Sequence, residues 1–176
     1  MDANPRKLYE FLHAGNQFVI PVFQRKYVWK KKNWERLWED LQALSEAAEK
    51  LHFMGSIVSV PYHSEPGEPP QFLVIDGQQR MITLVTLLAA IRDEAKAAGD
   101  DLLARQIQTD YLIHQYAEGD LRYKVFPRLR DRGAFFALVD EAPDGADGSG
   151  ITEAYRYFRD QIAASGAEGR AAYECV

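Results

Sequence analysis

The chain has 176 residues with an ordinary hydrophobic fraction of 47%, which suits one compact domain with a sizeable core. Its net charge of −5 argues against a protein that coats nucleic acid. No apolar run approaches the ~18 residues that span a membrane, and the first residues lack the apolar segment of a secretory signal. A single cysteine, Cys175, excludes an internal disulfide and a cysteine-based zinc site. We therefore expect a soluble cytoplasmic protein.

The predicted elements describe an α+β protein. Up to Gly99 we expect a helix over 5–14, a strand over 17–20, an extended edge segment over 20–29, an amphipathic helix over 31–51, a strand over 52–60, a hairpin loop over 63–71, a strand over 72–75 and a helix over 78–98. Beyond it we expect helices over 102–116, 133–139 and 152–164, a short strand over 122–126 and a flexible linker over 143–150. Trp34 and Trp38 recur at helical spacing, so we interpret both as core residues.

The segment FLVIDGQQR, residues 72–80, carries the strongest functional signal. A buried strand leads through Asp-Gly directly into an apolar helix, whose first N–H groups lack partners and whose dipole favours negative charge. Gly77 allows a ligand to approach the backbone, and Arg80 can hold phosphate in a planar fork. Gln78 adds an amide that a helix start does not require. The pattern predicts an anion site, for the phosphate of a nucleotide or a nucleic acid.

The same turn also has a purely structural interpretation. Asp76 and Gln79 are three residues apart and satisfy a loose capping-box pattern. Both residues would then only close the start of the helix, and Arg80 would be a solvated residue of its first turn.

A second motif, IPVFQRKYVW, covers residues 20–29. Proline and two aromatic residues favour an extended segment, in which alternate side chains share a face. One face would hold Phe23, Arg25, Tyr27 and Trp29. Arginine between aromatic residues suits a nucleobase held by stacking and a phosphate held by charge. The alternative is an edge strand whose aromatic residues cover the core while Gln24, Arg25 and Lys26 stay solvated.

Basic residues are concentrated in 1–38 and in 122–132, which suits binding at one face. Lys30, Lys31 and Lys32 open a helix, where positive charge opposes the dipole. Helix stability therefore does not explain this run. It is either a DNA contact or a solvated positive tip.

These motifs, with FMGSIV at 53–58 and VIDGQQRMITL at 74–84, resemble the N-terminal domain of GmrSD-type modification-dependent restriction enzymes, a family that includes the phosphorothioate-sensing SspE proteins. The segments YKVFPRLRD and ITEAYRYF extend the resemblance over nearly the whole chain. It implies a ParB/sulfiredoxin-like core over 1–99, with a small mixed sheet flanked by helices, and a mainly helical extension over 100–176. It also implies that the chain is a fragment, separated from a C-terminal HNH-type nuclease domain or partner subunit.

The resemblance further implies binding and hydrolysis of a nucleoside triphosphate, with GTP favoured and Mg²⁺ as cofactor, coupled to sensing of modified double-stranded DNA such as phosphorothioate DNA. No GKS or GKT phosphate loop occurs, so nucleotide binding would depend on the DGQQR turn. Arg80 and the N–H groups after Gly77 would hold the phosphates, Gln78 or Gln79 would orient the attacking water, and Asp76 would cap the helix or hold Mg²⁺. The facing wall would comprise Pro21, Gln24, Arg25, Tyr27 and Trp29. Phe23 replaces the tyrosine often found at its position.

The DNA-binding residues would be Tyr27, Trp29, Lys30, Lys31, Lys32 and Arg128. A non-catalytic reader, which grips a backbone phosphate or phosphorothioate through the same turn, is the main alternative. A nuclease in its own right is a weaker one, because Asp76 has no paired carboxylate at metal-binding spacing.

Overall fold

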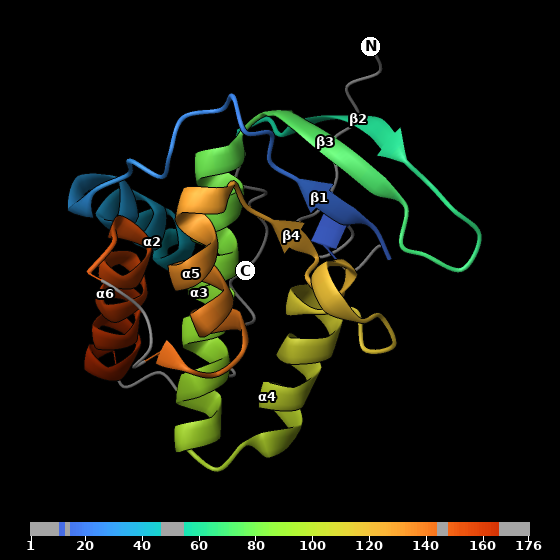
Figure 1. Cartoon of the computed structure of the whole chain (residues 1–176). Coiled ribbons are helices and arrows are strands. Elements are labelled where there is room, and N and C mark those ends of the chain that lie inside the picture. The colour runs from blue at the N-terminus through green and yellow to red at the C-terminus, as the bar shows by residue number, and fades with distance from the viewer. Residues whose placement is uncertain (1–10, 13–14, 47–54, 144–147, 166–176) are drawn as a thin grey trace.

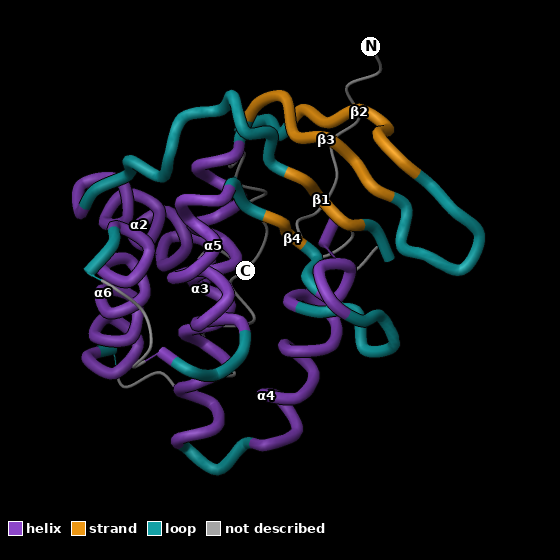
Figure 2. Tube along the Cα trace, viewed as in Figure 1, coloured by secondary structure: helices purple, strands orange, loops and turns teal. Residues whose placement is uncertain are grey.

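The computed structural model describes residues 11–12, 15–46, 55–143 and 148–165, and they form an α+β fold (Figure 1). The sequence prediction of the fold class is thus confirmed. Figure 2 shows the strands together at one side of the molecule and the helices packed beside them. The elements are β1 (Gln17–Val19), α2 (Lys31–Glu46), β2 (Val58–His63), β3 (Gln71–Asp76), α3 (Gln78–Ala97), α4 (Asp101–Ile107), a π-helical turn (Gln108–Leu112), a 3₁₀ turn (Gly119–Arg122), β4 (Val125–Phe126), α5 (Leu129–Val139) and α6 (Gly150–Ala164).

The described strands form one sheet in the order β2-β3-β1-β4. Strand β1 pairs in parallel with β3 and with β4, so that Phe18 lies opposite Phe72 on one side and Val125 on the other. Strand β2 pairs antiparallel with β3 through the predicted hairpin. The three parallel strands therefore end at one edge of the sheet and begin at the opposite edge.

Helix α3 is the central element of the core. It begins directly after β3 and runs between α6 and α4 (Figure 1). Its sequence is apolar on all sides, which is typical of a fully enclosed helix, and Met81 to Arg92 is buried without interruption. Within the described residues, no helix has both the length and the apolarity needed to cross a bilayer.

The amphipathic helix α6 packs along α3, and the amphipathic helix α2 packs against α6. Trp34 and Trp38 are buried, as predicted, and the Trp38 ring lies 6.5 Å from that of Phe158 in α6. Tyr155 of α6 is also buried, which confirms the predicted inner face of this helix.

Several predicted boundaries were wrong. The helix expected over 102–116 ends at Leu112, because Ile113 takes an extended conformation and bridges to Tyr123. Helix α5 begins at Leu129, directly after Arg128 as N-cap, and keeps Gly133 in its interior. The strand expected over 52–60 is β2 at 58–63, since its pairing with β3 fixes the register. Most of the helix over 5–14, the end of the helix over 31–51 and the centre of the linker over 143–150 lie outside the described residues.

Candidate functional site

Three chain segments meet at the edge where the parallel strands end. They are the residues that follow β1, β3 and β4, and they include both sequence motifs. Ligands of open sheets commonly bind outside the carboxyl ends of parallel strands. The candidate site therefore comprises three segments: 20–29, 76–80 and 127–131.

Gly77 makes the sharp turn from β3 into α3. Its φ of 89° lies in the left-handed region, which side chains other than hydrogen disfavour. A Cβ at this position would lie 2.9 Å from the carbonyl oxygen of Ser56 and 3.0 Å from the Cα of Ile57. Conformation and space both require glycine here, and the turn is held against the 56–57 backbone.

The predicted capping box is wrong. Gly77 itself is the N-cap of α3, and no described side chain caps the helix. Asp76 is exposed, and the side chain of Gln79 bonds elsewhere. The first backbone hydrogen bond of the helix runs from Met81 N to Gly77 O at 2.9 Å. The preceding N–H groups thus face the turn without a side-chain acceptor, which is the arrangement that suits an anion.

Two glutamines at the start of α3 connect the two motifs. Gln79, which is buried, accepts a hydrogen bond from Val28 N at 2.8 Å and donates one to Lys26 O at 3.0 Å. Gln78 is also buried, and its Nε2 donates to Arg25 O at 3.4 Å. Its Oε1 is buried without a partner among the described residues. The sequence motifs are therefore brought together, and one polar atom at their junction remains unsatisfied.

These side-chain bonds explain why residues 20–29 are not the predicted edge strand. The backbone groups that a strand partner would use are bound by side chains of α3 instead. Gln24 Nε2 donates to Ile75 O at 2.8 Å, and Arg128 donates to Gln24 O at 2.7 Å. The segment is a loop fixed at several points. The guanidinium of Arg128 is one of the groups that hold it, through the hydrogen bond to Gln24 O. Arg128 was predicted as a DNA contact.

Tyr27 lies in the core and not on an exposed binding face. Its hydroxyl is 2.7 Å from Thr83 Oγ1 and accepts a hydrogen bond from Trp34 Nε1 at 2.8 Å. Burial raises the pKa of Tyr27 to about 12, so the phenol stays protonated. The backbone N–H of Tyr27 donates to the Asp131 carboxylate. Burial raises the pKa of this carboxylate as well. The expectation that Tyr27 contacts DNA does not fit this position.

The other aromatic residues of the motif are divided between the core and the surface. Trp29 is half-buried and packs against the core, while Phe23 is 75% exposed at the tip of the loop. The alternating faces expected for this segment are thus wrong, because the chain turns at Val22 and Phe23 before it extends.

The cations of the site differ in how firmly they are held. Arg80 donates from Nη1 to Ser56 O at 2.7 Å, and its guanidinium covers Gly55. Arg25 and Lys26 are exposed. Arg80 is therefore oriented by the 55–56 backbone, whereas the other two side chains extend into solvent beside the turn.

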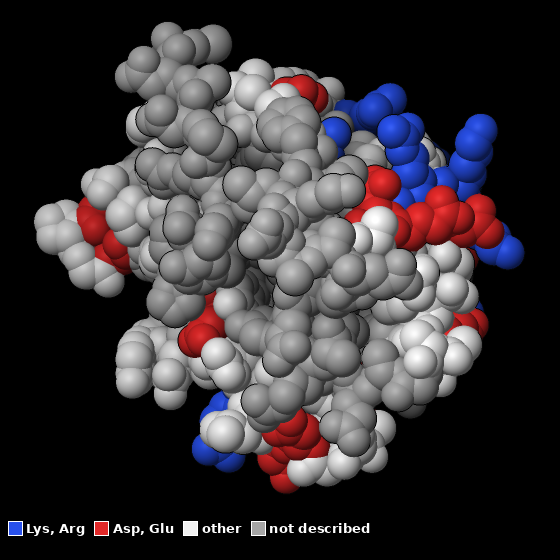
Figure 3. Space-filling view, turned by 180° about the vertical axis from the view of Figure 1, so that it is seen from behind, with Lys and Arg blue, Asp and Glu red and all other residues white. Residues whose placement is uncertain are grey.

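Lys30, Lys31 and Lys32 are all exposed at the start of α2. Lys30 lies 3.6 Å from Glu153 and Lys31 lies 3.6 Å from Glu35, in ion pairs that solvent screens. Figure 3 shows basic side chains gathered, with acidic ones beside them, on the side of the molecule where α2 lies.

Candidate metal ligands are sparse near the turn. Among the described residues, only His63, Glu65 and Glu68 bring three such groups together, and all three are exposed on the β2–β3 hairpin. That loop lies at the opposite end of β3 from Asp76. At the turn itself, Asp76 offers a single carboxylate, which suffices for Mg²⁺ only where phosphates complete the coordination.

A family model for the GmrSD restriction endonuclease N-terminal domain matches residues 8–172. The match includes both motifs and all of the described elements. The chain belongs to this family. It therefore corresponds to the N-terminal part of a restriction enzyme. No curated protein matches the chain.

In this GmrSD N-terminal domain, sequence analysis missed two partners of the site. Gly55, with a φ of 89°, and Ser56 receive the side chain of Arg80, and the motif FMGSIV that contains them gave the available signal. Asp131 holds Tyr27 N from a helix more than 100 residues away. No local pattern marks that pairing.

Proposed function

We propose that the turn Asp76–Arg80 binds the phosphates of a nucleoside triphosphate, with GTP favoured, and promotes its hydrolysis when the domain senses modified DNA. The observation that carries the proposal is Oε1 of Gln78, which is buried at the start of a 20-residue helix; in the part of the chain that the structure describes, this oxygen has no partner and the helix start has no side-chain cap. Buried polar atoms normally have partners, and a bound ligand or its water would provide one.

The role proposed for each residue follows from which of its polar atoms are still available for a ligand. The N–H groups after Gly77 and the remaining donors of Arg80 would hold phosphate oxygens and offset the charge that develops in the transition state. Gln79 has both amide atoms engaged with the 26–28 backbone, so it serves as a support. Gln78 keeps a free oxygen and is the better candidate to orient the attacking water. Arg25 would approach from the exposed loop.

Mg²⁺ would bind between Asp76 and the nucleotide phosphates, because a single carboxylate with phosphates is a common coordination for this ion. Bound there, it would neutralise charge on the transferred phosphoryl group.

The direct test is phosphate release from GTP, ATP and CTP with Mg²⁺, in the presence and absence of modified DNA. Arg80→Ala should lose nucleotide binding and turnover, while Arg105→Ala, at an exposed position of α4, should keep both. Thermal unfolding of each variant would establish that the fold persists. An Arg80→Ala protein that binds nucleotide as well as the wild type would overturn the assignment.

A second candidate function is a non-catalytic reader of modified DNA. The observation that favours it is the exposure of Val22 at 77% and Phe23 at 75%, directly beside Arg25 and Lys26. Sulfur is larger and less strongly hydrated than oxygen, so apolar side chains next to cations would favour a phosphorothioate over a phosphate.

Anisotropy titrations with phosphorothioate and plain duplexes would test the reader. Phe23→Ser should remove the preference for the modified duplex, and equal affinity of the wild-type domain for both duplexes would exclude this function. Replacing Lys30, Lys31 and Lys32 by Gln should weaken binding to both duplexes alike and lower the salt dependence.

A further inference from the structure

The edge of the sheet where the parallel strands begin contains a hollow of about 520 Å³. Gly15 precedes β1, Pro70 precedes β3 and Lys124 precedes β4, and the 109–117 segment completes the wall. This volume lies in the range of small-molecule sites. We call it the strand-start hollow. It lies at the opposite edge of the sheet from the DGQQR turn, so the proposed nucleotide site does not use it.

Lys124 is the first unusual residue of the hollow. Its side chain is 4% exposed, and its ammonium group donates to Leu12 O at 3.2 Å and to Asp110 O. An ammonium group has three donors, and two of them have acceptors among the described residues, so one N–H remains for a group in the hollow. Burying a lysine costs desolvation free energy, and a purely structural role would not require a charged residue at this position.

His114 is the second. Burial and the nearby charge of Lys124 lower the pKa of His114 to about 4, so the ring is neutral, although its hydrogen bond with the Asn16 backbone acts in the opposite direction. Its Nε2 is buried and has no partner among the described residues. A neutral imidazole whose other nitrogen donates a hydrogen bond presents Nε2 as an acceptor. The hollow therefore offers one donor and one acceptor on neighbouring side chains.

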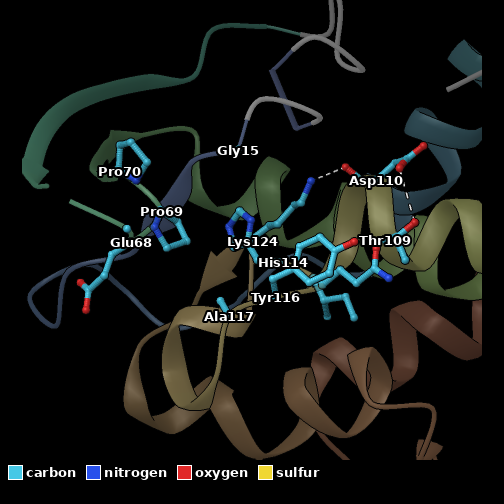
Figure 4. Close-up of a pocket in the computed structure, with 13 residues that line it drawn as sticks. Gly15, Glu68, Pro69, Pro70, Thr109, Asp110, His114, Tyr116, Ala117 and Lys124 are labelled. Carbon is cyan, nitrogen blue, oxygen red and sulfur yellow. Dashed lines mark hydrogen bonds between the residues drawn. The ribbon is translucent and has the colours of Figure 1, made fainter. Parts of the chain in front are cut away.

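The walls suit a flat molecule. Figure 4 shows Pro69 and Pro70 on one side, the ring of Tyr116 on the other, and His114 and Lys124 between them. Tyr116 is 93% exposed, which is unusual for an aromatic ring and leaves its face free to stack.

Charge argues against an ionic ligand. The hollow is lined by one lysine and by the carboxylates of Asp110 and Glu68, so it carries no positive excess that would attract a phosphate. The ammonium of Lys124 beside His114 Nε2 disfavours a metal ion at that nitrogen. A neutral, planar ligand with a donor next to an acceptor satisfies both side chains.

We propose that the strand-start hollow binds the lactam edge of a nucleobase, the adjacent N–H and C=O found in guanine, hypoxanthine, uracil and thymine. The N–H would donate to His114 Nε2, the C=O would accept from Lys124 Nζ, and Tyr116 would stack on the ring. The base would come from a free nucleoside or nucleotide or from a base extruded from DNA. Both sources present the same edge.

The test compares ligands that differ only at this edge. Uridine and inosine should bind in saturation-transfer NMR, whereas 3-methyluridine and 1-methylinosine, which lack the ring N–H, should bind at least about tenfold more weakly. The ¹⁵N resonance of His114 Nε2 should shift on binding. Inorganic phosphate should neither bind there nor compete. Equal binding of methylated and unmethylated nucleosides, no binding of any nucleoside at millimolar concentration, or competition by phosphate would each overturn the proposal.

Variants assign the contacts without disturbing the fold. Tyr116→Ala should weaken binding about tenfold, while the control Tyr62→Ala, an exposed tyrosine of β2 outside the hollow, should not. His114→Asn keeps a donor for the Asn16 backbone, but its shorter side chain places no acceptor at the position of Nε2, so it should abolish the preference for unmethylated ligands. Unchanged selectivity in His114→Asn would also contradict the proposal. A duplex with one unpaired uracil, compared with a fully paired duplex and with free uridine, would identify the source of the base.

Discussion

The side-chain oxygen of Gln79 accepts a hydrogen bond from the backbone N–H of Val28 at 2.8 Å, and the same amide donates to Lys26 O at 3.0 Å. One side chain thus satisfies two backbone groups of a loop 51 residues away. Its neighbour Gln78 is equally buried but keeps an oxygen that has no partner among the described residues. Two adjacent glutamines of one motif therefore have different tasks. Gln79 fixes the loop, and Gln78 is the residue that we propose for the ligand.

Replacing each glutamine by leucine should separate these tasks. Gln79→Leu leaves two backbone groups unpaired and should lower the free energy of unfolding by about 2–4 kcal/mol. Gln78→Leu removes an unsatisfied buried oxygen and one long hydrogen bond, so stability should change by less than about 0.5 kcal/mol or rise. Nucleotide turnover should nevertheless fall in Gln78→Leu. Urea unfolding and phosphate-release assays measure both, and a Gln78→Leu protein that loses stability as Gln79→Leu does would contradict this division.

Sequence reasoning predicted the turn around which the candidate site is built, but not the long-range hydrogen bonds that hold it. The strand, the Gly77 turn and helix α3 follow from local pattern, because apolar periodicity and Asp-Gly are signals within a few residues. The capping box was wrong because Gln79 bonds to a distant loop, and local spacing cannot distinguish these partners. Tyr27 was assigned to a binding face because its core position depends on Thr83 and Trp34, which only the tertiary fold brings together.

Alanine substitutions at three glycines can separate the cost of backbone strain at positive φ from the cost of steric crowding around a new Cβ. Gly77 combines a φ of 89° with a Cβ position 2.9 Å from Ser56 O, so Gly77→Ala should cost about 2–4 kcal/mol of unfolding free energy. Gly99 has a φ of 83° with open space around it, so Gly99→Ala should cost only about 1 kcal/mol. Gly133, within α5, has neither feature, and Gly133→Ala should stabilise by about 0.5–1 kcal/mol. A Gly77→Ala cost no greater than that of Gly99→Ala in denaturant unfolding would show that the 56–57 backbone yields.

Arg92 is the most deeply buried cation among the described residues, and it joins α3 to the end of α5. Its guanidinium donates to Leu138 O at 2.7 Å, to Val139 O at 2.9 Å and to Asp93 at 2.8 Å. Arg92→Met should cost about 3–5 kcal/mol, because it removes the buried cation that these acceptors share and leaves the Asp93 carboxylate with only the hydrogen bond from the Tyr155 hydroxyl among the described residues. Arg92→Lys should recover only part of this, since an ammonium cannot span the same acceptors. Arg105→Met, at an exposed position, is the control, and an equal loss of stability in the two methionine variants would refute the role.

Lys124 should make the stability of the domain depend on pH in a direction that can be worked out. Burial lowers its pKa from 10.5 to about 8, so between these values the unfolded chain binds more protons than the folded one. Stability should therefore rise as pH increases from about 8 toward 10.5. Above a pH of about 10 the tyrosines oppose this rise in stability. Burial raises the pKa of Tyr27, Tyr123 and Tyr155 to about 12, so the folded state keeps protons that the unfolded state loses. Urea unfolding between pH of about 8 and about 9.5 isolates the lysine.

Lys124→Met should abolish this rise, because it removes the titrating ammonium, with its hydrogen bonds to the Leu12 and Asp110 carbonyls, while keeping the stem of the side chain. It should also raise the pKa of His114, since the charge of Lys124 contributes to holding that pKa near 4. The imidazole titration followed by NMR measures this coupling independently of stability. A Lys124→Met protein with the same pH slope as the wild type would mean that the ammonium reaches solvent. In that case Lys124 would not be the fixed donor that a base in the strand-start hollow requires.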